Sequence, residues 1–79
     1  MILDIEGKEI NVGDEVYCAF NNATMWKIRI LKETDKSIHY KCQYKSDSWL
    51  PVGKKAGDWT EHKTYMHKTS HSFKNMLKV

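Results

Sequence analysis

The chain has 79 residues, a formal net charge of +3 and 41% hydrophobic residues. This length allows one small domain and leaves little interior for a deep active-site cleft. No apolar run of the chain approaches the roughly 18 residues of a membrane span. The first residues, Met1–Asp4, lack the basic segment of a signal peptide. We therefore expect a single domain over residues 1–79, in the cytoplasm and without membrane contact.

The net charge hides an asymmetry between the two halves. Residues 1–35 carry four basic and seven acidic side chains, whereas residues 36–79 carry nine lysines and three acidic side chains. A basic half favours nucleic acid or an acidic protein surface as partner, although lysines also serve solubility alone. Arg29 is the one arginine among 13 basic residues, which argues against a dedicated bidentate reader of phosphate or guanine.

Residues 1–12 predict a lead-in hairpin. Leu3–Ile10 has Glu6-Gly7 at its centre, and glycine supplies the positive φ that a tight turn requires. Val12–Asp14 predicts a second turn for the same reason.

Three consecutive strands follow, and each alternates between apolar and polar residues. We predict them over Glu15–Phe20, Met25–Leu31 and Ser37–Tyr44, joined by turns at Asn21-Asn22 and Thr34–Lys36. One face of this meander should form the core, together with most of the aromatic residues. The predicted core residues are Val16, Cys18, Ile28, Ile30, Ile38 and Cys42. The two cysteines then are small, reduced core residues, with an inter-strand disulfide as the alternative.

The opposite face of the meander is basic. Antiparallel pairing should place Lys27 and Arg29 beside lysines of the next strand. Two further lysines lie in the glycine-containing segment Val52–Asp58, which predicts a flexible loop. The predicted nucleic-acid-binding residues are Lys27, Arg29, His39, Lys41, Lys45, Lys54 and Lys55.

The pattern changes after Lys45. Trp49-Leu50 predicts a short strand that Pro51 limits to an edge, and Trp59–Met66 predicts the last strand. In the tail from residue 70, apolar residues at spacings of three and four predict a short helix capped by a serine. These tail residues, which are candidates for a protein contact, are Phe73, Met76 and Leu77.

The first half of the chain resembles a known class of small barrels. The pattern Asp4-x-x-Gly7-Lys8-x-Ile10-x-x-Gly13-Asp14-x-Val16 looks like the opening of SH3-like barrel proteins that are frequent in phage genomes. The segments 13–20, 26–30 and 40–44 are similar to the Tudor and KOW-type branches of that fold. The resemblance covers about residues 4–47 and implies a mainly β, five-stranded SH3-like barrel over 13–69, followed by a tail over 70–79.

The resemblance also implies partners. KOW-type domains contact RNA, ribosomes or RNA polymerase, and Tudor domains bind methylated lysine or arginine in an aromatic cage. Carried onto this chain, the cage draws on Phe20, Trp26 and Tyr44, with Asp47 as its acid, but the usual Asp-Tyr-Gly run after Tyr44 is missing. These aromatic residues are also in phase with the apolar residues of their strands, so they could instead lie in the core. The predicted aromatic groove consists of Phe20, Trp26, Tyr44 and Trp49. Lysines near Trp49 suit the binding of single-stranded nucleic acid.

Catalysis is not expected. The acid–base candidates are the four histidines, His39, His62, His67 and His71, and no nucleophile elbow, P-loop or dinucleotide motif is present. His39 and Cys42 are three residues apart on a strand, so their side chains face opposite ways and do not form a ligand pair. We predict no catalytic residue, no metal and no cofactor.

These observations predict a non-catalytic binding module, and the resemblance implies that a phage encodes it. Its partner would be nucleic acid or a nucleic-acid-processing complex of the host, bound through the basic sheet face. One alternative is an accessory protein that docks on a host protein and inhibits or redirects it. A third is a Tudor-like aromatic-cage reader. The oligomeric state is left open, because exposed edge strands also allow a homodimer.

Overall fold

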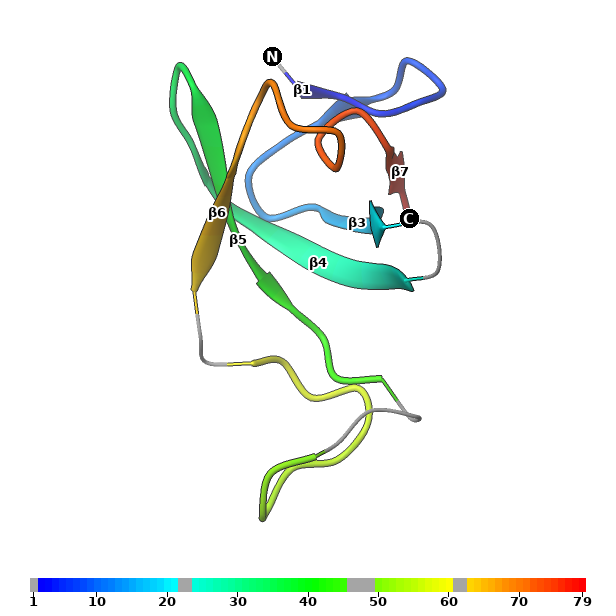
Figure 1. Cartoon of the computed structure of the whole chain (residues 1–79), viewed down its shortest axis with the longest axis vertical. Helices are drawn as coiled ribbons and strands as arrows, with labels where there is room; N and C mark the ends of the chain where they lie inside the picture. The colour runs from blue at the N-terminus through cyan, green and yellow to red at the C-terminus, as the bar shows by residue number, and fades with distance from the viewer. Residues whose placement is uncertain (1, 22–23, 46–49, 61–62) are drawn as a thin grey trace.

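The computed structural model describes residues 2–21, 24–45, 50–60 and 63–79, which form β-strands and no helix (Figure 1). The strands are β1 (Ile2–Leu3), β2 (Glu9–Ile10), β3 (Glu15–Asn21), β4 (Thr24–Glu33), β5 (Ser37–Cys42), β6 (Thr64–His67) and β7 (Met76–Lys78). The mainly β class predicted from the alternation is therefore confirmed.

The strands form two antiparallel sheets. β1 and β2 make a two-stranded hairpin, and the other strands form a five-stranded sheet in the order β6-β5-β4-β3-β7. β3 to β6 follow one another as a meander, and β7 returns across the molecule to pair with β3, placing Met76 opposite Cys18. The first and last parts of the chain therefore meet at one end of the sheet.

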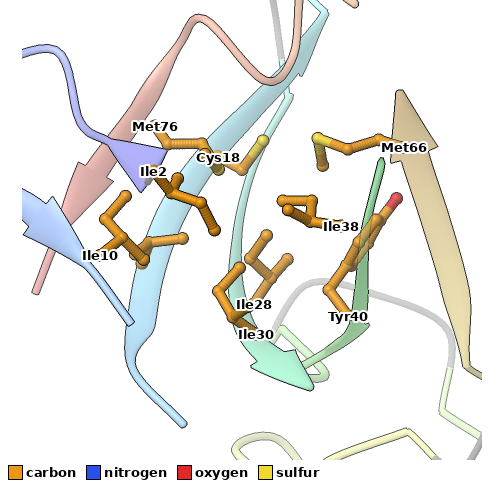
Figure 2. Close-up of a cluster of buried hydrophobic side chains, with 10 residues drawn as sticks. Ile2, Ile10, Cys18, Ile28, Ile30, Ile38, Tyr40, Met66 and Met76 are labelled. Atoms are coloured by element: carbon orange, nitrogen blue, oxygen red, sulfur yellow. The ribbon is translucent and has the colours of Figure 1, made fainter. Parts of the chain in front are cut away.

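The core lies on one side of the five-stranded sheet and is closed by the N-terminal hairpin (Figure 2). The predicted alternation holds, because Val16, Cys18, Ile28, Ile30 and Ile38 have no exposed surface. Among the described residues, the buried cluster consists of Ile2, Ile10, Val16, Cys18, Ile28, Ile30, Ile38, Tyr40, Met66 and Met76.

Both cysteines are free, as predicted. Cys18 is fully buried and Cys42 packs against the core. Burial raises the pKa of the Cys18 thiol to about 12 and also raises that of Cys42. Because the thiolate is the reactive form, the two side chains behave as small apolar core residues.

The predicted helix in the tail is wrong. Residues 76–78 form β7, and a turn precedes it in which the backbone N–H of Phe73 donates to the Ser70 hydroxyl at 3.2 Å. The Cys18 thiol donates to the Ser72 carbonyl at 3.3 Å and ties this turn to β3. A helix of one or two turns has little stability of its own. Pairing with the free edge of β3 and burial of Met76 therefore decide the conformation.

The last strand of the meander is also shorter than predicted. β6 begins at Thr64, whereas Trp59 makes only an isolated antiparallel bridge with Gln43. The predicted short strand at Trp49-Leu50 is not found at Leu50, and Trp49 lies outside the described residues.

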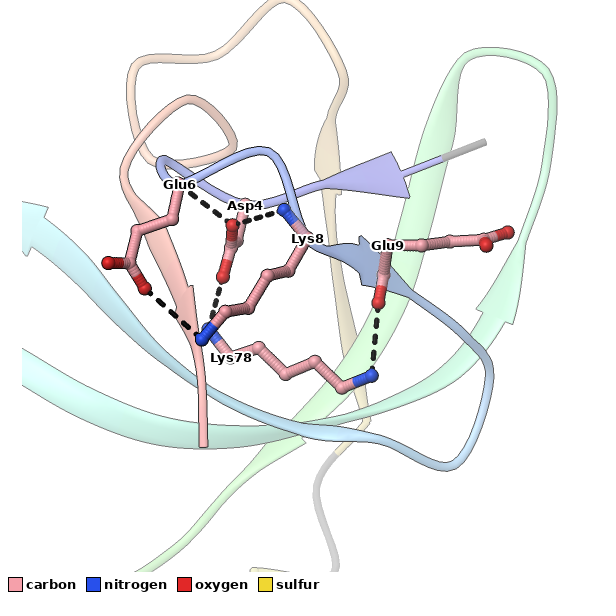
Figure 3. A network of polar contacts seen from close by, with 5 residues as sticks. All are labelled: Asp4, Glu6, Lys8, Glu9 and Lys78. Carbon is pink, nitrogen blue, oxygen red and sulfur yellow. Dashed lines mark hydrogen bonds and ion pairs between the residues drawn. The ribbon is translucent and has the colours of Figure 1, made fainter.

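Asp4 joins the N-terminal hairpin to β7 (Figure 3). Its Oδ1 accepts hydrogen bonds from the backbone N–H groups of Glu6 and Lys8, both at 2.8 Å, and its Oδ2 accepts one from Lys78 at 3.0 Å. Gly7 adopts the positive φ of 81° that this turn requires. The Lys78 contact covers a backbone group that an edge strand would otherwise expose. Both oxygens of the Asp4 carboxylate therefore act as hydrogen-bond acceptors, which accounts for an acid at this position.

Replacing Asp4 by asparagine is expected to lower the Tm by roughly 5 °C or more at neutral pH, because an amide nitrogen then faces a backbone N–H donor. Backbone hydrogen bonds, that of Lys78 first, hold the pKa of Asp4 below its usual range. The unfolded chain then takes up this proton first on acidification, so stability falls as the pH drops below about 5.

Thermal denaturation followed by circular dichroism at several pH values tests this prediction. The Asp4→Asn variant should lose less stability between neutral and acid pH than the parent chain. Asp35→Asn, the same change at an exposed turn residue, is the matched control. Equal pH profiles for the parent and Asp4→Asn would contradict the prediction.

Candidate nucleic-acid interface

The sheet face that points away from the core carries most of the predicted basic strand residues; we call it the outer face. Arg29 of β4 pairs with Lys41 of β5, and Lys27 pairs with Tyr17 of β3. Directly paired residues place their side chains on the same face. His39 lies two residues before Lys41 and therefore shares this face. The structure thus brings together Lys27, Arg29, His39 and Lys41.

An acidic side chain lies among these cations. Glu15 of β3 pairs with Arg29; its Oε2 accepts a hydrogen bond from Arg29 Nη2 at 2.8 Å, and its Oε1 lies 3.1 Å from Lys27 Nζ. These contacts, that of Arg29 first, hold the pKa of Glu15 below its usual range. Lys27 and Arg29 therefore share one carboxylate. Within the described part of the chain, Lys41 has no ion-pair partner.

Trp59 completes the surroundings of Arg29. The guanidinium carbon lies 4.4 Å from the centroid of the Trp59 ring, which is a cation–π geometry. Trp59 reaches this place because it bridges Gln43, the residue after β5. The guanidinium is therefore held between a carboxylate and an indole, with its orientation set by both.

A cluster of rings lies at the β6 side of the outer face. Tyr65 of β6 pairs with His39 of β5, and their ring centroids are 5.8 Å apart. The His67 ring meets Tyr65 edge-on at 5.5 Å. Tyr65 remains 56% exposed. We refer to the continuous surface formed by Trp59, Arg29, Lys41, His39, Tyr65 and His67 as the outer strip.

Three residues of the outer strip, Trp59, Tyr65 and His67, are not among the binding residues that the sequence predicts. The outward position of Tyr65 could have been predicted from the sequence. Its neighbour Met66 is apolar and suits the core face of a strand, and alternation then turns Tyr65 outward. No comparable signal existed for Trp59, whose place depends on pairing with Gln43 across the chain.

Lys45 does not join the outer face, which corrects the predicted placement. Its Nζ lies 5.1 Å from the ring centroid of Trp26, a half-buried residue that packs against the core. The alternation continues only as long as the strand does, and β5 ends at Cys42. Lys45 is therefore positioned by the segment that follows the strand.

Lys54 and Lys55 belong to a separate arm. Residues 50–60 extend away from the sheet (Figure 1) and are tied to the chain after β5. The Tyr44 N–H donates to the Asp58 carbonyl at 2.9 Å, and the Gln43 side chain donates to the Gly57 carbonyl at 2.8 Å. The arm thus places its lysines beyond the end of the sheet.

The predicted aromatic groove is described in part. Trp26 and Tyr44 are half-buried, whereas the Phe20 side chain, Asp47 and Trp49 lie outside the described residues. The Lys45 ammonium covers the Trp26 ring, which is the position that a methylated cation would take in a cage.

The apolar tail residues are buried or half-buried in the fold. Met76 is fully buried, Phe73 packs against the core, and Leu77 is half-buried opposite Tyr17. They therefore do not lie together on one face of a short helix, as their spacing predicts.

His62 also lies outside the described residues. In the part that the structure describes, no three His, Cys, Asp or Glu side chains are grouped so that they could hold a metal ion. The same part contains no helix that could span a membrane.

We compared the chain with known protein families, curated proteins and solved structures. No curated protein and no solved structure matches the chain. A family described as a domain of unknown function, DUF7205, matches residues 2–76 and so covers nearly the whole sequence. The chain therefore belongs to the DUF7205 family.

Proposed function

We propose that this domain is a non-catalytic module that binds nucleic acid through its outer face. The observation that carries the proposal is the convergence of Lys27, Arg29 and Lys41 on one side of a small sheet, where Glu15 is the acid in contact with Lys27 and Arg29 among the described residues. Strands β3 to β6 form a meander, and β7 pairs with its first strand, β3. This order supports an SH3-like barrel as the scaffold.

The chemistry of this face suits a polyanion. Cations that neutralise phosphates release the counterions condensed on the nucleic acid, and this release drives binding at low salt. Lys41 offers a charge that no described residue neutralises. Arg29, oriented by Glu15 and Trp59, offers guanidinium donors at a defined place.

Fluorescence anisotropy with labelled mixed-sequence RNA and DNA tests the proposal. We expect binding at about 50 mM salt that weakens steeply by about 200 mM, with a log–log slope near −0.7 to −0.9 for each phosphate neutralised. Absence of binding to both nucleic acids at the lower salt concentration would overturn the proposal.

Replacing Glu15 by glutamine is expected to strengthen this binding on the order of fivefold at low salt. The carboxylate competes with phosphate for Lys27 and Arg29, and its removal leaves both cations to the nucleic acid. Glu9→Gln makes the same charge change on the N-terminal hairpin and is the matched control. An equal gain in both variants would assign the effect to net charge and contradict a role of the outer face.

A further inference from the structure

We infer that the outer strip selects single-stranded nucleic acid, with Tyr65 as the ring on which an unpaired base stacks. This inference rests on the function proposed above and deepens it. It begins with the exposure of Tyr65, which is 56% accessible although both sequence neighbours are more buried. Met66 points from β6 into the core (Figure 2), so the alternation of the strand turns Tyr65 toward solvent.

The Tyr65 ring is flanked by two imidazoles. The His39 ring is tilted by 36° at 5.8 Å, and the His67 ring is perpendicular at 5.5 Å. Such contacts restrict the phenol to few orientations, so little conformational freedom is lost when a base stacks on it. Among the described residues, no cation covers the Tyr65 ring, whereas Arg29 covers Trp59. Tyr65 is therefore an exposed aromatic ring of the strip that is available to a ligand.

The cations lie next to this ring along the same strands. His39, which pairs with Tyr65, is two residues from Lys41 on β5, a separation of about 7 Å along a strand. Lys41 in turn pairs with Arg29 of β4. A base on Tyr65 would thus have a phosphate-binding charge within the length of about one nucleotide. Aromatic rings alternating with cations are the arrangement that holds single strands.

A duplex can contact the cations of the outer strip but cannot stack a base on Tyr65. Its bases are stacked on one another, so their faces are closed to a protein ring, and a duplex has only its phosphates to offer to Lys41 and Arg29. A single strand offers phosphates and base faces together. The geometry therefore favours unpaired nucleotides.

Anisotropy titrations with a labelled oligothymidine and oligouridine of about ten nucleotides, and with a hairpin duplex, test the inference. The parent chain should bind both single strands more tightly than the duplex. Tyr65→Ala should weaken single-strand binding by about 5- to 100-fold, the range that one stacked base accounts for, and leave duplex binding within about twofold. Tyr65→Phe keeps the ring and should bind like the parent chain.

Tyr65→Leu separates stacking from simple apolar contact, because leucine keeps bulk without a π-face. It should lose as much single-strand affinity as Tyr65→Ala. If Tyr65→Ala does not fold, as judged by circular dichroism, the comparison of Tyr65→Leu with Tyr65→Phe carries the test. In the parent chain, the Tyr65 ring proton resonances should shift upfield on addition of the single strand and not of the duplex.

The preference for single strands and the binding of nucleic acid can be contradicted separately. Equal affinity for single strand and duplex, or full single-strand affinity in Tyr65→Leu, would overturn the inference while the binding function stands. No binding of either probe at low salt would overturn both.

Discussion

Replacing Met76 by alanine is expected to lower the free energy of unfolding by about 2–5 kcal/mol. For a domain of this size, that loss corresponds to a decrease in Tm of roughly 10–30 °C. Met76 has no exposed surface and pairs with Cys18 across the β3–β7 ladder, so the shorter side chain leaves a cavity in the centre of the core. A domain of this length has a total stability of about 4–12 kcal/mol, so this single change removes a large part of it.

Leu77→Ala is the matched control for Met76. Leu77 is the next residue of β7, is half-buried and lies opposite Tyr17 on the other face of the sheet. Its truncation should cost about 1 kcal/mol, because less surface is returned to water. Urea and thermal denaturation followed by circular dichroism measure both values. Equal losses would show that the tail does not form the strand described above.

Replacing Lys41 by glutamate is expected to weaken nucleic-acid binding by about tenfold or more at low salt. Within the described residues no carboxylate pairs with Lys41, whereas Lys27 and Arg29 share Glu15, so Lys41 should make the strongest phosphate contact of the three. The log–log salt slope should become shallower by about one, because one phosphate contact is lost. Anisotropy titrations over a range of salt concentrations give both quantities.

Lys74→Glu provides the same charge change outside the proposed site. Lys74 is exposed in the turn before β7. Its replacement should reduce affinity by much less than that of Lys41, since it alters the net charge without removing a contact. If the two variants lose affinity equally, binding depends on the overall charge of the domain and the outer face is not the site.

The sequence determined which side of each strand faces the core. The alternation of Val16 with Tyr17 and of Ile28 with Lys27 is a local property, because neighbouring side chains of a strand always point to opposite faces. The same rule grouped Lys27, Arg29 and Lys41, since register in an antiparallel pair follows from the buried face. These parts of the candidate site were predictable before any contact was known.

The conformation of the tail and the placement of Lys45 depended on tertiary structure. Spacings of three and four residues between Phe73, Met76 and Leu77 suit a helical turn, but the same residues also suit a turn followed by a strand. The free edge of β3, more than 50 residues earlier in the chain, decided between them by offering a hydrogen-bonding partner and a core to fill. Lys45 follows the end of β5, where strand parity no longer applies.

The electrostatic and aromatic details of the outer face were likewise decided by long-range contacts. The partial neutralisation of Arg29 by Glu15, the indole of Trp59 over its guanidinium, and the contact of Tyr65 with His39 each join residues from different strands or segments. Side-chain charge and parity are local, and so the sequence by itself determined that a basic face exists. Which of its charges are available and which ring lies beside them depend on the distances between strands, and only the tertiary structure decided those.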